Sequence, residues 1–124
     1  KHAGAYKVLE SADADKIAKD KGFTTAAKET PACLKCHTVQ ADASLFSESF
    51  NIQDGVQCET CHGAGSEYKS MSIMKDKQKS IENGLIVHTE KEAFCTQCHN
   101  AESPTFKGFD YATYWEKIKH NKAK

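Results

Sequence analysis

Three copies of one short pattern, Cys-x-x-Cys-His, use every cysteine of this 124-residue chain. They occupy residues 33–37, 58–62 and 95–99. The pattern is the attachment signature of c-type haem, whose vinyl groups bond to the two thiols while the histidine reaches the iron. The sequence therefore predicts three covalently bound haems. Their thioether cysteines are Cys33, Cys36, Cys58, Cys61, Cys95 and Cys98, and their proximal ligands are His37, His62 and His99.

Other uses of six cysteines fit the pattern less well. Disulfides, zinc sites and redox dithiols do not require a histidine directly after every second cysteine. Zinc sites also combine cysteine pairs two by two, so three pairs leave one unmatched. Haem attachment is therefore the preferred interpretation, with disulfides or zinc as the alternative.

Composition predicts one small domain over residues 1–124 with a thin aliphatic core. Only 39% of the residues are hydrophobic, and the mean hydropathy is −0.65. Three porphyrins would supply much of the missing apolar surface, so we expect the chain without haem to be largely unfolded. The expected fold class is mostly α, with short helices and long loops wrapped around three covalent haems and little or no β-structure.

The charge balance argues against nucleic acid as a partner. Seventeen lysines offset 17 acidic residues, and three ferric haems at about −1 each would make the loaded protein slightly acidic. Lysines gather locally, which fits either a solvated surface or the steering of an acidic redox partner. The two clusters are Lys69, Lys75, Lys77 and Lys79, and Lys117, Lys119, Lys122 and Lys124.

The expected location is the periplasm or the cell exterior. No apolar run is long enough to span a membrane, and the chain begins at Lys1 without an initiator methionine. Covalent haem attachment normally takes place outside the cytoplasm, so we expect an exported protein whose signal peptide has been removed.

Apolar periodicity and helix-capping residues outline the expected helices. One helix is predicted over residues 3–20 and another over the lysine-rich residues 66–83. Thr30-Pro31, Asp54, the capping box from Thr89 to Glu92 and Asp110 are expected to start further helices. The first three of these starts precede the haem motifs, which are therefore placed on short helices.

Three histidines remain after the proximal ligands are assigned, one for each iron: His2, His88 and His120. Two imidazoles on one iron make a centre that passes electrons without binding substrate. His2 lies at the edge of an apolar helical stripe, while His120 either contacts a haem or is exposed. His88 is a distal ligand or a distal-pocket acid. Met71 and Met74 are more consistent with packing than with ligation.

Several segments together resemble the cytochrome c-554 family over most of the chain. They are His-Ala-x-Ala-Tyr from His2, the residues around Cys33 to His37, and Gly-Val-x-Cys-Glu-x-Cys-His-Gly-x-Gly from Gly55. The segments from His88 to His99, from Ser103 to Phe106 and from Phe109 to His120 add to it. The family's first haem motif would precede His2, and a histidine expected soon after Gly65 is missing. The chain thus resembles a three-haem version that lacks one site.

The resemblance implies a set of ligands. It assigns His2 to the haem of residues 58–62 and His120 to the haem of residues 95–99. It also implies a five-coordinate haem at residues 33–37. The open face of that haem would be lined by His88 and by Pro104, Thr105 and Phe106.

Three functions follow as hypotheses. The first is an electron carrier that exchanges electrons with other redox proteins by transient, electrostatic docking. The second is an oxidoreductase that binds nitric oxide or hydroxylamine at the first haem, with His88 as proton donor. The third is a head-to-tail filament in which His2 reaches the haem of a neighbouring copy.

Overall fold

The computed structural model describes residues 1–120, which contain short helices and no strand. About half of the protein is helical, which confirms the mostly α class. The described residues form two compact units, one of residues 1–60 and one that begins at Cys61. None of the helices in this part of the chain combines the length and apolarity that a bilayer crossing needs. The single domain predicted for residues 1–124 stays a prediction.

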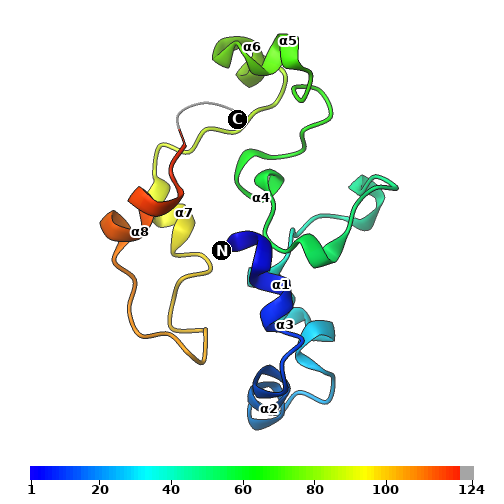
Figure 1. Ribbon diagram of the computed structural model, residues 1–124, viewed down its shortest axis with the longest axis vertical. Helices are drawn as coiled ribbons and strands as arrows, with labels where there is room; N and C mark the ends of the chain where they lie inside the picture. The colour runs from blue at the N-terminus through cyan, green and yellow to red at the C-terminus, as the bar shows by residue number, and fades with distance from the viewer. Residues whose placement is uncertain (121–124) are drawn as a thin grey trace. The chain divides into compact units, whose positions relative to one another are not determined.

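The first unit begins with two helices where the sequence predicted one (Figure 1). Helix α1 spans Ala5–Val8 and α2 spans Ala12–Asp20. Ser11 separates them, because its Oγ accepts the Ala14 N–H at 3.2 Å and donates to the Val8 carbonyl at 2.8 Å. A hydroxyl that satisfies both helix ends favours a break over a continuous helix.

Helix α3, Pro31–His37, carries the whole first motif. It starts at the predicted Thr30-Pro31 pair, with proline in the first turn, where no N–H is needed. The Thr30 hydroxyl is buried and donates back to the Ala26 carbonyl at 2.8 Å, so it fixes the preceding turn and does not cap the helix.

A small aliphatic cluster supports this helix. Leu9, Ala14, Ala18 and Ala27 are buried together. Cys33 and Leu34 of α3 pack against them. The cluster is small, as the composition predicted, and it holds one of the haem-attachment cysteines directly.

Helix α4, Cys58–His62, carries the second motif and lies where the chain passes from the first unit to the second. Asp54 does not cap it. That residue lies in the 3-10 turn Ile52–Asp54. The helix ends at His62, and Gly63, with φ of +75°, turns the chain out of it.

The lysine-rich segment that follows is two helices, α5 (Met71–Met74) and α6 (Lys77–Glu82). The prediction of a single helix over residues 66–83 was wrong at its start and in its continuity. Asp76 interrupts it, because its Oδ1 accepts the Lys79 N–H at 3.1 Å and begins α6. The predicted end is confirmed, since the chain leaves α6 through Asn83 and Gly84.

Two further helices complete the second unit. Helix α7, Lys91–Cys95, ends inside the third motif, and Glu90 rather than a Thr89 capping box stands at its start. Helix α8, Tyr111–Ile118, begins at Asp110 as predicted. The carboxylate of Asp110 accepts the Thr113 N–H at 3.3 Å and the Thr113 hydroxyl at 2.8 Å.

Candidate haem-binding sites

No disulfide joins any of the six cysteines, two of which lie in each motif. Burial raises the pKa of the Cys33 thiol, with nearby Cys36 adding to the effect, and burial likewise raises the pKa of Cys95. A reactive redox dithiol needs the opposite shift, toward thiolate. In residues 1–120 no group of three or more histidine, cysteine or carboxylate side chains is placed to hold a metal ion. The raised pKa values of Cys33 and Cys95 are therefore the opposite of what a reactive redox dithiol at the first or third motif would need.

The histidine of the first motif is held in one orientation within the first unit. His37 Nδ1 donates to the Ala5 carbonyl at 2.7 Å. A carbonyl only accepts, so in the neutral ring Nδ1 carries the proton and Nε2 keeps its lone pair. This is the arrangement by which proteins orient a metal-binding histidine. Helix α1 thus fixes the orientation of His37, the histidine predicted to be the proximal ligand of the first motif.

The histidine of the second motif is held in the same manner by its own unit. His62 Nδ1 donates to the Ile86 carbonyl at 3.0 Å, while the Ile86 N–H donates to the His62 carbonyl at 3.0 Å. The Tyr68 hydroxyl lies within hydrogen-bonding distance of the carbonyls of His62 and Gly63, at 3.0 and 2.8 Å. These contacts give the extended segment 85–87 a definite task, which is to orient His62.

A second imidazole lies beside His62. The ring centre of His120 is 5.8 Å from that of His62, and the two ring planes are 68° apart. Nitrogen ligands lie roughly 2 Å from a transition metal, so two imidazoles that share one metal have ring centres about 6 Å apart. The observed separation fits such a pair. The resemblance assigned His120 to the third motif, but within the second unit its ring lies at the second.

The histidine of the third motif is packed by aromatic rings. Its ring stacks on Phe109, with centres 4.6 Å apart and planes within 10°. Phe109 in turn stacks on Tyr114 at 5.4 Å. A cavity of about 270 Å³ opens beside this motif. It is lined by Cys98, His99, Ser103, Thr105, Phe106, Lys107, Gly108 and Tyr114.

His88 lies beside the second motif. Its Nε2 donates to the Cys61 carbonyl at 2.7 Å, and its ring stacks on Phe94 at 3.9 Å. With Nε2 engaged, only Nδ1 keeps a lone pair for a metal or a proton. Phe94 immediately precedes Cys95, so His88 connects the second motif to the helix that enters the third. Sequence reasoning did not foresee this contact, because the spacing of 27 residues carries no signal.

His2 is anchored through its backbone in the first unit. The Val56 N–H donates to the His2 carbonyl at 3.1 Å, two residues before Cys58. Gly55 makes this approach possible, because a Cβ at that position would lie 2.7 Å from the His2 carbonyl oxygen. The resemblance assigned His2 to the second motif, and its backbone does lie against the segment that leads into that motif.

The residues present fit haem c. Each motif offers two thiols outside any disulfide, and His37 and His62 each present Nε2, because Nδ1 donates to a carbonyl. The histidine pair at the second motif has the spacing of two ligands on one metal. These features are what covalent attachment and axial ligation require.

Comparisons with known proteins indicate a multihaem c-type cytochrome. The family model described as cytochrome c554 and c-prime matches residues 1–63, slightly more than half of the chain. A curated relative, the C-type polyheme cytochrome OmcC of Geobacter sulfurreducens, is 27% identical over 94 residues. That match covers 65% of this chain and 12% of the relative, so the chain spans about an eighth of that protein's length. No solved structure matches the chain.

Proposed function

This chain belongs to the cytochrome c554 and c-prime family, and from that premise we propose that it is an electron-transfer protein carrying three covalent haems. Multihaem c-type cytochromes as a class bind haem c covalently and serve electron transfer with redox partners. The number of haems and the ligands are the proposal. Haem, when bound, supplies one-electron chemistry, and the protein supplies position, axial ligands and surroundings.

Each motif has a defined task in this proposal. The cysteine pairs would form the thioethers, and His37, His62 and His99 would each bind one iron. Carbonyls of Ala5 and Ile86 accept from Nδ1 of the first two imidazoles and so leave Nε2 available for a metal. A carbonyl that accepts from Nδ1 also raises the basicity of the ring, which strengthens it as a ligand.

The pair of His62 and His120 is the observation that carries the proposal. If both imidazoles held one iron, they would leave it no place for a substrate, and the haem there would supply electron exchange and no further chemistry. His2 and, through Nδ1, His88 are then the histidines left for distal positions at the other two haems. Neither the family match nor the curated relative supports reduction of a nitrogen species at the first haem.

Partners and location follow from the family. Members of the cytochrome c family are typically exported, and we infer a periplasmic or extracellular protein that meets other redox proteins in brief encounters. Small interfaces with lysine at their rim suit such encounters, since they favour fast association over long residence.

EPR of the oxidised, haem-loaded protein tests the ligand pair. Imidazole planes 68° apart give a low-spin signal of large anisotropy. His120→Ala should remove this signal and replace it by a high-spin signal, and added free imidazole should restore the low-spin form. Met71→Leu, at an exposed residue of the same unit, is the control, and it should leave the signal unchanged. An unaltered low-spin spectrum in His120→Ala would contradict the pair.

Intact-protein mass spectrometry tests the number of haems independently. The purified chain should be heavier than the peptide by three haems. Replacing both cysteines of any one motif by alanine should remove one haem. A mass equal to that of the bare peptide would overturn the proposed function itself.

A further inference from the structure

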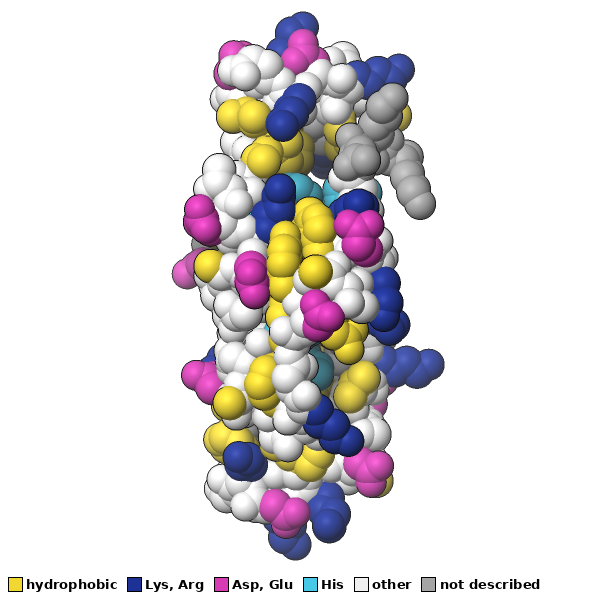
Figure 2. Space-filling model, turned by 90° about the vertical axis from the view of Figure 1, so that its left-hand side faces the viewer, with side chains coloured by type: hydrophobic (Ala, Val, Ile, Leu, Met, Phe, Trp, Pro, Cys, Tyr) yellow, Lys and Arg dark blue, Asp and Glu magenta, His cyan; other side chains and the backbone are white. Residues whose placement is uncertain are grey.

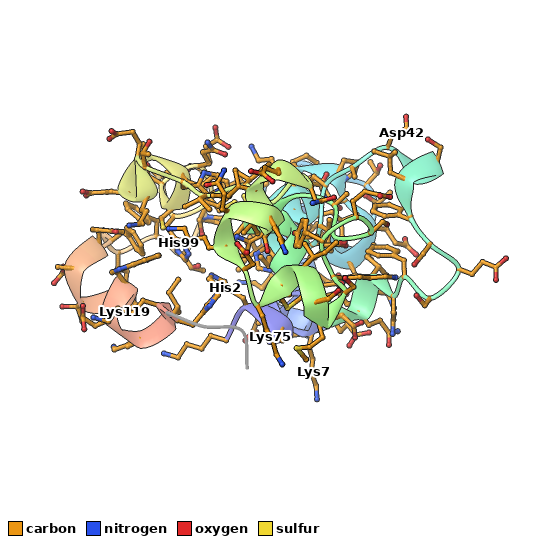
Figure 3. All side chains as sticks on the ribbon, turned by 90° about the horizontal axis from the view of Figure 1, so that it is seen from above. His2, Lys7, Asp42, Lys75, His99 and Lys119 are labelled. Atoms are coloured by element: carbon orange, nitrogen blue, oxygen red, sulfur yellow. The ribbon has the colours of Figure 1, made fainter. Side chains whose placement is uncertain are left out.

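A stack of three nearly parallel rings runs outward from the third motif. His99, Phe109 and Tyr114 follow one another with centres 4.6 and 5.4 Å apart and planes within 10°. Tyr114 is 43% exposed, so its ring ends at the protein surface. Figure 3 shows His99 on the segment after α7 and Lys119 at the end of α8, the helix that carries Tyr114. The proposed proximal ligand His99 is therefore linked to the exposed ring of Tyr114 through Phe109.

Lysines surround the outer end of this stack. Lys117 Nζ lies 4.9 Å from the centre of the Tyr114 ring, and Lys107 lines the same cavity as Tyr114 and His99. Lys91 Nζ lies 5.4 Å from the ring centre of Trp115, the next residue of α8. Figure 2 looks onto the side of α7 and α8 and shows hydrophobic side chains flanked by charged ones.

The acidic residues of α8 are engaged by their neighbours. Glu116 pairs with Lys119 at 2.7 Å, and the carboxylate of Asp110 accepts two hydrogen bonds from Thr113. Lys117 lies near enough to Asp110 that its positive charge contributes to lowering the pKa of this carboxyl. Lys107 and Lys117 are the lysines that lie beside Tyr114, where their charge can attract an acidic partner.

We propose that Tyr114, with Lys107 and Lys117 beside it, is the docking surface at which an acidic redox protein exchanges electrons with the third haem. The inference rests on the proposed function. It adds the surface at which the partner docks and the sign of the partner's charge. A haem held by Cys95, Cys98 and His99 would accept one electron from the partner's metal centre, and no bond would be made or broken. The ring stack provides continuous van der Waals contact over the last part of this route.

Charge and contact have separable effects in this surface. Lysines steer the encounter, so their removal lowers the second-order rate and its salt dependence. The rings act after the partner has docked. Their removal therefore lowers the first-order rate of electron transfer within the complex and leaves the second-order rate of association unchanged. A purely structural role of either group would not divide the kinetics in this way.

Stopped-flow reduction of the haem-loaded protein by a reduced plant-type ferredoxin, an acidic iron–sulfur protein, tests the proposal. Lys117→Glu should lower the second-order rate at least fivefold at low ionic strength, and Lys117→Gln about twofold. Lys75→Glu, in the other lysine cluster, is the matched control and should change the rate less than twofold. Phe109→Leu should lower the rate at saturating ferredoxin and leave the second-order rate within twofold.

Two results would overturn the docking surface. One is equal loss in Lys117→Glu and Lys75→Glu, which would mean that ferredoxin responds to overall charge. The other is an unchanged rate in both lysine variants, in which case a different face is used. Haem content and far-UV circular dichroism verify that each variant is folded. Reduction of all haems by dithionite separates these outcomes from failure of the proposed function, in which no haem would be reduced.

Discussion

The two units of this protein hold their haem motifs by different means. In the first, small aliphatic side chains of α1, α2 and the turn at Ala27 form a cluster, and Cys33 packs directly against it. In the second, ring contacts gather at His88, His99 and His120. The first motif is thus supported by the protein's own core. The second unit relies on side chains that pack around the proposed ligands, and we expect it to depend more strongly on haem.

Removal of the cysteines gives the largest expected effect. With all six replaced by alanine, haem cannot attach, and the few buried apolar side chains cannot offset the entropy of ordering 124 residues. We expect most of the helical signal in far-UV circular dichroism to disappear. A well-folded spectrum from this variant would refute the view that haem provides the core.

A sharper form of the same experiment compares single motifs. Cys95→Ala with Cys98→Ala should increase hydrogen exchange throughout residues 61–120. Cys33→Ala with Cys36→Ala should leave more protection in residues 1–60, because the cluster of Leu9, Ala14, Ala18 and Ala27 remains. Equal loss of protection in the two variants would remove the distinction between the units.

Gly55→Ala should destabilise the first unit strongly. Gly55 has φ of +69° and ψ of −136°, a conformation open essentially to glycine alone, and an added Cβ would meet the backbone oxygen of His2. We expect the free energy of unfolding of the haem-loaded protein to fall by about 2 kcal/mol or more in guanidinium titrations. Gly4→Ala is the control, because its Cβ would meet nothing within 4 Å. Equal stability of the two variants would show that the approach of His2 to Val56 is dispensable.

Ser11→Ala should have a smaller effect, also in the first unit. Ser11 caps α2, and loss of a serine cap costs about 1 kcal/mol, whereas glycine at the same position costs a few tenths. Unfolding of Ser11→Ala and Ser11→Gly measures this difference. The EPR signal of the His62 and His120 pair should not respond, since both of its members belong to the second unit. A change in that signal would mean that the cap acts beyond its own unit.

The sequence predicted the motifs, the mostly α class and the helix starts at Pro31 and after Asp110, because each has a local chemical cause. It missed the breaks at Ser11 and Asp76. Both are capping residues within patterns that read as continuous helix, and the cap outweighed the apolar periodicity. It could not foresee that His88 donates to Cys61, or that His120 lies beside His62. These contacts join residues 27 and 58 positions apart and depend on how the chain folds back.

Two capping aspartates, one in each unit, give the smallest expected effect that still distinguishes the two units. The pKa of Asp110 lies below its ordinary value, chiefly because the Thr113 side chain donates to it, and the pKa of Asp42 is lowered in the same way by Ser44. A carboxylate with a depressed pKa stabilises the fold above the ordinary value of 3.8 and loses this contribution as pH falls through its folded-state pKa. Both caps should therefore weaken only below about pH 4.

The consequences of the two caps should nevertheless differ. Asp110 begins α8, and this helix ends two residues before His120, whereas Asp42 caps only the 3-10 turn Ala43–Leu45. Asp110→Asn should broaden or diminish the low-spin EPR signal assigned to the pair of His62 and His120, and Asp42→Asn should leave it intact. In the wild type the same signal should weaken as pH is lowered past the Asp110 titration. If both variants, or neither, alter the signal at neutral pH, then the capping of α8 does not control the placement of His120.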